Sequence, residues 1–401
     1  MYVSFDPWSP AFVADPYPAY AALRAAGRAH YFEPTGQWLI PHYSDVSALL
    51  RDRRLGRTYL HRFSHDEFGL APPPEAHAAF HTLNGQGILD LEAPDHTRIR
   101  RLVAKAFTPR TVEALTPAVE RLAAGLVGEF VDAGGGDLLT EVAEPLPVAV
   151  IAEMLGVPES DRPLLRPWSA AICGMFELNP SEEAARAAVE ASVEFSSYLR
   201  GLITERRGDP GPDLITALIA AHDDEDRLTE QEIISTCVLL LNAGHEATVN
   251  ATVNSWWMLF RHPEQLAALR ADHSLLPTAV EELLRYDTPA PMFARWVLDE
   301  IEIDGTVLPR GSQVALLFAS ANRDPGRFAD ADRLDLSRED NPHISFGAGI
   351  HYCLGAPLAR VELAASFGEL LRRAPGMRPV AEPRWKPGYV IRGLRELLVE
   401  I

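Results

Sequence analysis

The sequence predicts a mostly α-helical protein with small β-sheets, and three observations support this fold class. From about residue 17 to residue 289, runs rich in Ala, Leu, Arg and Glu alternate with Pro and Gly, as in a series of helices. One of these helical patterns continues for roughly 30 residues. Beyond residue 295 the pattern changes to an alternation with period two, which is typical of strands. We find no repeat or flexible linker and therefore predict a single domain over residues 1–401.

The composition excludes several classes of protein. Hydrophobic residues make up 47% of the 401-residue chain, enough for a core, so the chain is not intrinsically disordered. With 37 Lys+Arg against 56 Asp+Glu the net charge is −19, which disfavours a nucleic-acid partner. The most apolar stretch, residues 237–260, is interrupted by Asn, His and Glu, so we expect no membrane span. The first residues do not resemble a signal peptide, and we expect a soluble cytoplasmic protein.

Residues 95–103 are predicted to form a helix whose two faces carry different types of residue. His96, Arg100 and Val103 lie on one face at the 3.6-residue period. Three basic residues lie on the opposite face, namely Arg98, Arg101 and Lys105. A basic face is unexpected in a chain this acidic. The simplest interpretation of such a face is a solvated surface.

The long helix begins at a clear signal. Thr229 and Glu232 form a capping box, and the helical pattern then continues to about Phe260, before Pro263. At 1.5 Å per residue such a helix is about 45 Å long.

The strand patterns lie in the last third of the chain. Residues 297–308 alternate around Asp304-Gly305, which predicts a β-hairpin. Residues 389–391 and 397–401 form a second alternating patch and are also predicted to be extended.

A cysteine in a glycine-rich loop is the sharpest chemical feature. The sequence Phe346-Gly-Ala-Gly-Ile-His-Tyr-Cys353-Leu-Gly355 is followed by a helical pattern with Pro357 in its first turn. Cys353 therefore lies at a helix N-terminus, which favours a thiolate, and such a thiolate suits an axial iron ligand. One alternative is a buried, inert cysteine. The other is a nucleophile that uses His351, for which no third orienting group is evident.

This loop, with Ala359-Arg360 after it, resembles the heme-binding signature of the cytochrome P450 family, and the resemblance extends over nearly the whole chain. It implies a P450 fold, with a long central helix crossing the heme, in a protein of the bacterial soluble class. Heme b (iron protoporphyrin IX) would be the cofactor, and Cys353 would be the ligand of the iron. Phe346 and Gly347 would contact the heme beside it.

Two further motifs fit the same resemblance. Glu282 and Arg285 match the ExxR element of the family, and by resemblance Arg333 would complete an ion network that holds the cysteine loop. An isolated ExxR pair is usually a solvated surface pair. By resemblance the face of the helix at residues 95–103 that carries His96 and Arg100 would hold the heme propionates. Arg295 and His351 match the remaining propionate contacts.

The long helix carries a stripe of small residues that is similar to the oxygen-binding segment of the family. Ala243 and Gly244 would leave a groove for the heme, and Gly244 permits a local distortion of the helix. Close helix packing is the structural alternative. The family usually has a threonine directly after the acid, whereas here Ala247 follows Glu246 and Thr248 points about 100° further around the helix. We therefore hypothesise that proton delivery uses Glu246 through water, Thr248, or a hydroxyl of the substrate.

The predicted function is a heme-thiolate monooxygenase that oxidises a hydrophobic, natural-product-like molecule by hydroxylation or epoxidation. The chain contains no flavin-binding segment, so a separate protein would supply the electrons, and we expect ferredoxin and ferredoxin reductase in this role. By resemblance the basic face flanks the thiolate side, where an acidic donor would dock. The alternatives are another oxidation, such as phenol coupling, and a non-catalytic helper. The identity of the substrate, the site of its oxidation and the oligomeric state are not predicted. The expected substrate contacts are Ile88, Leu89, Leu240, Met292, Phe293 and Ile391.

Overall fold

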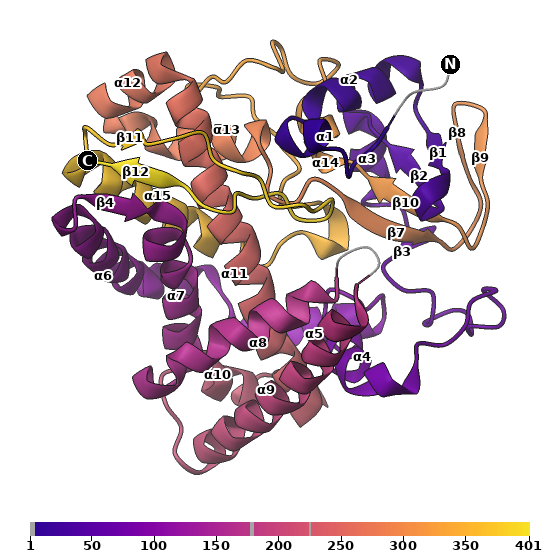
Figure 1. Ribbon diagram of the computed structural model, residues 1–401. Coiled ribbons are helices and arrows are strands. Elements are labelled where there is room, and N and C mark those ends of the chain that lie inside the picture. Colours follow the sequence, from indigo (N-terminus) through magenta and orange to yellow (C-terminus); the bar gives the residue numbers. More distant parts are fainter. Residues whose placement is uncertain (1–4, 177–179, 224–225) are drawn as a thin grey trace. The chain divides into compact units, whose positions relative to one another are not determined.

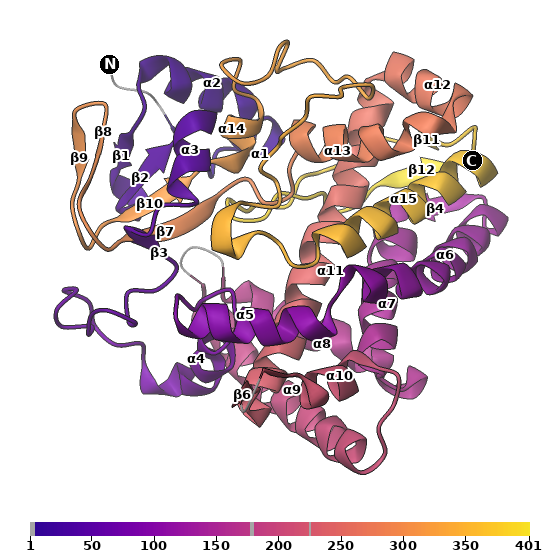
Figure 2. The same cartoon turned by 180° about the vertical axis from the view of Figure 1, so that it is seen from behind.

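The computed structural model describes residues 5–176, 180–223 and 226–401. The chain divides into two compact units, each assembled from separate segments. The first unit comprises Met1–Gly56, Ala123–Pro145 and Ala247–Ile401, and the second comprises Arg57–Leu122 and Leu146–Glu246. Figures 1 and 2 show the chain from two opposite sides. A single domain stays a prediction.

The first unit contains the sheets with the longest strands. Its helices are α1 (Pro10–Ala14), α2 (Tyr17–Ala26), α3 (Tyr43–Leu49), α12 (Pro263–Ala271), α13 (Leu276–Tyr286), α14 (Phe318–Asn322) and α15 (Ala356–Arg373). Short 3₁₀ or π turns are η1 (Glu33–Thr35), η3 (Leu139–Ala143), η5 (His273–Leu275) and η6 (Gly349–His351). Its strands are β1 (His30–Phe32), β2 (Gln37–Ile40), β3 (Leu55–Gly56), β4 (Gly135–Asp137), β7 (Phe293–Val297), β8 (Ile301–Ile303), β9 (Thr306–Leu308), β10 (Gln313–Leu316), β11 (Arg378–Pro379) and β12 (Leu398–Glu400).

Five of these strands form one sheet in the order β1-β2-β10-β7-β3. β10 pairs in parallel with β2 and antiparallel with β7, so that Val314 lies opposite both Trp38 and Arg295. The predicted hairpin is confirmed as β8–β9. Asp304 and Gly305 at its turn have φ angles of 50° and 76°, the left-handed conformation that a tight hairpin turn requires.

The largest core of the first unit surrounds the second half of α11 (Glu230–Arg261). Trp256 is almost fully buried there and packs against Phe367 of α15. Leu283 of α13 and Leu370 of α15 belong to the same core. Figures 1 and 2 show α13 and α15 side by side, which places the end of the ExxR motif near the helix that follows the cysteine loop.

The regular elements described in the second unit are helices and one short hairpin, and residues 57–74 form turns and irregular chain. Its helices are α4 (Ala78–Gly85), α5 (Asp95–Ala106), α7 (Pro145–Leu155), α8 (Arg162–Gly174), α9 (Glu182–Gly208) and α10 (Leu214–Ala220), with the 3₁₀ turns η2 (Glu75–His77) and η4 (Glu159–Asp161). α6 (Pro109–Asp132) and α11 contribute residues to both units. The hairpin consists of β5 (His222–Asp223) and β6 (Asp226–Arg227).

The long helix is confirmed, and its start is capped as predicted. In α11 the Glu232 carboxylate accepts from the Thr229 amide at 2.8 Å, and the Thr229 hydroxyl accepts from the Glu232 amide at 3.2 Å. The helix is a continuous α-helix through Gly244.

One strand prediction is wrong. Residues 389–391 form bends rather than a strand, whereas β12 occupies the end of the chain. Tyr389 is nearly fully buried and packs against Phe5 and Phe12. Its apolar pattern therefore reflects burial against aromatic rings rather than strand pairing.

Candidate active site

The cysteine loop is shaped by its glycines and by a backbone hydrogen bond. The Cys353 amide donates to the Phe346 carbonyl at 2.9 Å and closes the loop. Gly347 and Gly349 have φ angles of 68° and 70°, and a Cβ atom on Gly349 would lie 2.5 Å from the Leu50 carbonyl oxygen. Side chains are therefore excluded at this position by strain and by space.

Cys353 is followed by the first turn of α15, with Gly355 at the N-cap. A Cβ atom on Gly355 would lie 3.9 Å from the Cys353 Sγ, so the sulfur lies beside the backbone that begins the helix. The other two cysteines have different surroundings. Burial raises the pKa of the Cys173 thiol to about 12, with a further contribution from the negative charge of Glu246, and burial likewise raises the pKa of Cys237 to about 12. Both stay protonated near neutral pH, which leaves Cys353 as the candidate thiolate.

The ExxR pair is a fully buried ion pair rather than a surface pair. Arg285 Nε donates to Glu282 Oε2 at 2.7 Å, and its Nη2 donates to Oε1 at 2.8 Å. The same guanidinium donates to the carbonyl oxygens of Asn322 and Ala331. Asn322 in turn accepts from the Ile344 amide and donates to the Ser345 hydroxyl. The buried pair is thus linked to the residues directly before Phe346.

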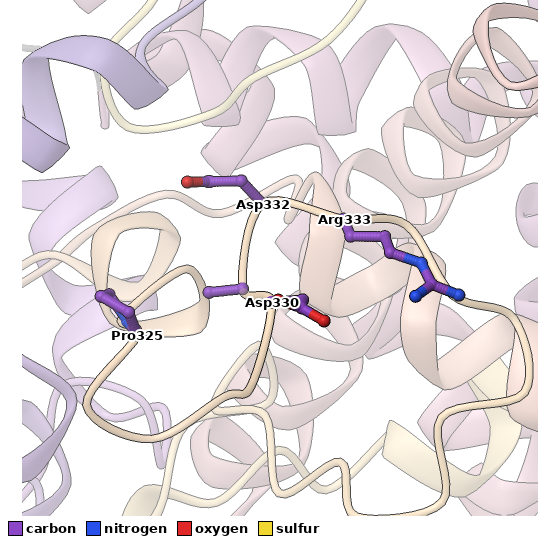
Figure 3. Close-up of a pocket in the computed structure, with 5 residues that line it drawn as sticks. Pro325, Asp330, Asp332 and Arg333 are labelled. Carbon is purple, nitrogen blue, oxygen red and sulfur yellow. The ribbon is translucent and has the colours of Figure 1, made fainter.

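The expectation that Arg333 completes this ion network is wrong. Its side chain is 63% exposed and lies 3.7 Å from Asp335, and Figure 3 shows it extending from the loop in the direction opposite to Asp332. Arg338 takes the place instead, because its Nε donates to Glu282 Oε2 at 3.1 Å and its side chain is only 11% exposed. Arg333 contributes its backbone carbonyl, which accepts from Arg285.

A second ion pair at the loop was missed from the sequence. Arg360 of α15 donates to both carboxylate oxygens of Glu281 at 2.6 and 2.7 Å, and its guanidinium lies 4.5 Å from the centre of the Phe346 ring. His343 also contacts Glu281, at 3.1 Å. Hydrogen bonds from Arg360 and His343 outweigh the effect of partial burial and lower the pKa of Glu281 to about 2. Glu281 directly precedes the ExxR motif and Arg360 belongs to the loop signature. No rule of sequence spacing predicts that these two residues form an ion pair.

The middle of α11 has one accessible stripe. Residues 232–238 and 248–259 are buried, whereas Ala243 is exposed and Leu240 and Ala247 are half-buried. Gly244 beside the stripe packs on α7, where a Cβ atom would lie 3.3 Å from the Ile151 Cδ1. Gly244 is therefore explained by helix packing, while Ala243 and Ala247 present small side chains on an open face. Glu246 is half-buried next to this stripe, and Thr248 is buried.

The four residues predicted to contact the heme propionates are divided between the two units. His96 is buried and Arg100 half-buried on the same face of α5, in the second unit. Arg295 on β7 is 5% exposed, with its guanidinium 5.6 Å from the centre of the Phe293 ring, and His351 is half-buried in η6. The latter two belong to the first unit.

Comparison with known proteins decides the family. A family model described as "Cytochrome P450" matches residues 169–374. The cytochrome P450 monooxygenase PikC of Streptomyces venezuelae is 42% identical over 396 residues, which cover 96% of this chain and 91% of that protein. The chain belongs to the cytochrome P450 family. Nocardicin C N-oxygenase of Nocardia uniformis subsp. tsuyamanensis is 40% identical over 403 residues, covering 98% of this chain and 97% of that protein.

A solved structure agrees. The crystal structure of P450BioI in complex with an acyl carrier protein ligated to hexadec-9Z-enoic acid superposes with a TM-score of 0.91 at 37% identity, covering 98% of this chain and 100% of that chain. The predicted P450 fold and the heme cofactor are thereby confirmed, and the chain is a cytochrome P450 monooxygenase.

The residues present fit a heme held by a single protein ligand. The described residues contain no cluster of three or more His, Cys, Asp or Glu that would bind another metal. Cys353 beside its glycine-rich turn is the type of donor that a thiolate-ligated P450 cofactor requires, and α11 separately presents small side chains at Ala243 and Ala247. In the part of the chain that the structure describes, none of the helices has both the length and the apolar character of a membrane span.

The basic face of this P450 differs from the expectation. Arg101 Nη1 lies 2.8 Å from Asp223 and Lys105 Nζ lies 2.7 Å from the same carboxylate, while Arg98 lies 3.0 Å from Asp226 and also contacts Glu232. All three cations that we took as available to a partner are therefore already paired with acids of this chain.

The predicted substrate contacts are placed as follows. In the second unit Ile88 is buried in the turn after α4, Leu89 is half-buried beside it, and Leu240 lies on the accessible stripe of α11. In the first unit Met292 is 2% exposed, and Phe293 and Ile391 are half-buried. Phe293 stacks on Phe318 with ring centres 5.8 Å apart.

Proposed function

We propose that this P450 inserts one oxygen atom of O₂ into a hydrophobic natural-product-like molecule, with electrons from ferredoxin and ferredoxin reductase. The observation that carries the proposal is Cys353, the one candidate thiolate among the three cysteines, on a loop whose neighbouring residues form two buried or half-buried ion-pair networks. A bound thiolate-ligated heme supplies the activation of O₂ and the cleavage of its O–O bond.

The chain's own residues would bind and orient this cofactor. Cys353 is the proposed iron ligand, and Phe346, Gly347, Ala243 and Gly244 are the proposed contacts with the macrocycle. His96, Arg100, Arg295 and His351 would donate to the propionates, since all four are buried or half-buried donors. Glu282, Arg285 and Arg338 would hold the loop without touching the reacting atoms.

Glu246, Ala247 and Thr248 would govern proton delivery. A half-buried carboxylate at the accessible stripe is able to take a proton from water and pass it on. Ala247 has no hydroxyl with which to complete the relay, so a water molecule or a substrate hydroxyl would take that part. This requirement favours substrates with a polar group near the oxidised carbon.

The substrate class rests on the apolar side chains at Ile88, Leu240, Met292 and Phe293 together with the relatives, one of which is named for N-oxygenation of nocardicin C. We therefore propose a natural product with a bulky apolar part that contacts these side chains. A different oxidation of such a molecule, including phenol coupling, is the second candidate, because Ala247 removes the usual hydroxyl.

The test is the difference spectrum of the reduced protein with and without carbon monoxide. We expect the red-shifted Soret band of a thiolate-ligated heme, and its loss in Cys353→Ser. Cys173→Ser and Cys237→Ser are matched controls that should keep the band. A wild-type protein without the red-shifted band, or a Cys353→Ser variant that retains it, contradicts the proposal.

A further inference from the structure

The basic face of α5 is covered by carboxylates of the same chain. Arg98, Arg101 and Lys105 point from one side of the helix toward the strands β5 and β6, which we call the acidic hairpin. Lys105 Nζ also donates to the His222 carbonyl at 2.8 Å, and Arg98 Nη1 donates to Asp226 at 3.0 Å. Each of these three cations is thus paired with Asp223, Asp226 or Glu232 of the same chain.

The acidic hairpin is poorly stabilised by itself. Each strand has two residues, and Asp223 lies directly opposite Asp226 in the register. Like charges at directly opposed positions destabilise an antiparallel pair, and an isolated two-stranded hairpin is marginal in water. Hydrogen bonding from Lys105, with the nearby charge of Arg101, lowers the pKa of Asp223 and keeps it ionised. The hairpin therefore depends on the cations of α5.

The same contacts are easily opened. The side chains of Arg101 and Lys105 are 54% and 44% exposed, and those of Asp223 and Asp226 are about one third exposed. Ion pairs that are this accessible are weak and are screened by salt. An external carboxylate surface would replace these partners without loss of any core packing.

We propose that the acidic hairpin is an intramolecular competitor for the acidic electron donor, which docks on Arg98, Arg101 and Lys105 by displacing Asp223 and Asp226. This inference rests on the proposed function for the identity of the donor. The argument for the occupant is charge complementarity, because α5 already binds paired carboxylates in the positions that an acidic protein would take. Such a competitor admits only partners whose acidic surface outcompetes the hairpin, and so adds selectivity to docking.

The first test measures binding of an acidic [2Fe–2S] ferredoxin, without electron flow, to the heme-loaded enzyme. We expect Asp223→Asn/Asp226→Asn to bind it about fivefold to thirtyfold more tightly, because two to four surface ion pairs no longer compete. The matched control is Glu182→Gln/Glu183→Gln on α9, which changes net charge equally at exposed carboxylates without a described ion pair. This control should shift the dissociation constant by less than about threefold. Equal effects in both variants, weaker binding in the hairpin variant, or no binding to either, overturns the proposal.

The second test distinguishes a ferredoxin that displaces the acidic hairpin from one that binds on top of the hairpin and leaves it in place. Backbone hydrogen exchange of the strand residues 222, 223, 226 and 227 should become faster when ferredoxin binds to the wild-type enzyme. Arg101→Gln/Lys105→Gln should show the same faster exchange without ferredoxin, and should bind it more weakly. Exchange that slows or stays the same on binding overturns the proposal. Ferredoxin that displaces the hairpin but fails to reduce the heme counts against the proposed electron source alone.

Discussion

Cys353, Cys173 and Cys237 carry the same thiol, and their surroundings decide which of them is suited to bind iron. Burial raises the pKa of the latter two to about 12, whereas Cys353 lies on a loop at the start of α15. The same reasoning applies to acids. Glu281 and Glu282 are adjacent, yet one is bound by Arg360 and His343 and the other by Arg285 and Arg338.

Glu362 of α15 is a buried acid that should make stability depend on pH. Its side chain is 3% exposed, and burial raises its pKa from the ordinary 4.5 to about 8. The unfolded chain therefore releases this proton first, and the free energy of unfolding should fall by about 1.4 kcal/mol per pH unit between these two pKa values.

We expect Glu362→Gln to remove this slope and to be more stable than the wild type at a pH of about 7. The measurement is urea unfolding at a series of pH values. Glu369→Gln on the same helix is the control, because Glu369 pairs with Arg372 and Arg373 at the surface and should keep the slope. A wild-type slope retained in Glu362→Gln contradicts the assignment.

Position 247 in α11 has alanine where the family usually has threonine, so a hydroxyl can be introduced there by substitution. We expect Ala247→Thr to increase the product formed per electron pair by about twofold to tenfold, the effect of one added hydrogen bond. Ala247→Val has the same shape without the hydroxyl and should not gain. No gain in Ala247→Thr, together with no loss for substrate analogues lacking polar groups, would falsify the idea that water or substrate assists proton delivery.

At the scale of elements, the cysteine loop is held by helices α13 and α15 in addition to its own glycines and backbone hydrogen bond. Buried Glu282 binds two guanidinium groups, and the network reaches Ser345 through Asn322. The charge that α5 presents is likewise determined by a tertiary contact, because its basic face is paired with the acidic hairpin. α11 differs, because its capping box and its length follow from neighbouring residues.

A matched pair of arginines tests the loop network. Arg338→Ala should lower the free energy of unfolding by about 1–3 kcal/mol, because the fully buried Glu282 carboxylate loses a charged donor. Arg333→Ala should change it by less than about 0.5 kcal/mol, since that side chain is mostly exposed. Urea unfolding of the heme-loaded variants measures both. The reverse order would restore Arg333 as the third member of the network.

At the scale of the whole molecule, heme and polypeptide are thermodynamically coupled. A cofactor that binds only the folded chain adds about 4 kcal/mol at a thousandfold excess over its dissociation constant. We expect removal of heme to lower Tm by several degrees, and Cys353→Ser to reduce heme retention in the folded protein. Scanning calorimetry of the holo and apo forms is the measurement. Equal Tm values would show that the folded state does not depend on the cofactor.

The amino-acid sequence by itself determined the family, the candidate iron ligand, the start of α11 and the β8–β9 turn. These features depend on residues that are neighbours along the chain, where spacing and periodicity suffice. The tertiary structure alone decided that Arg338 rather than Arg333 binds Glu282, that Arg360 joins Glu281, and that acids cover the basic face of α5. Each of these contacts joins residues between 56 and 134 positions apart, so no local pattern records them. Burial also depends on residues that are distant along the chain. For this reason Tyr389 was predicted to lie in a strand, and the burial of Glu362 was not predicted.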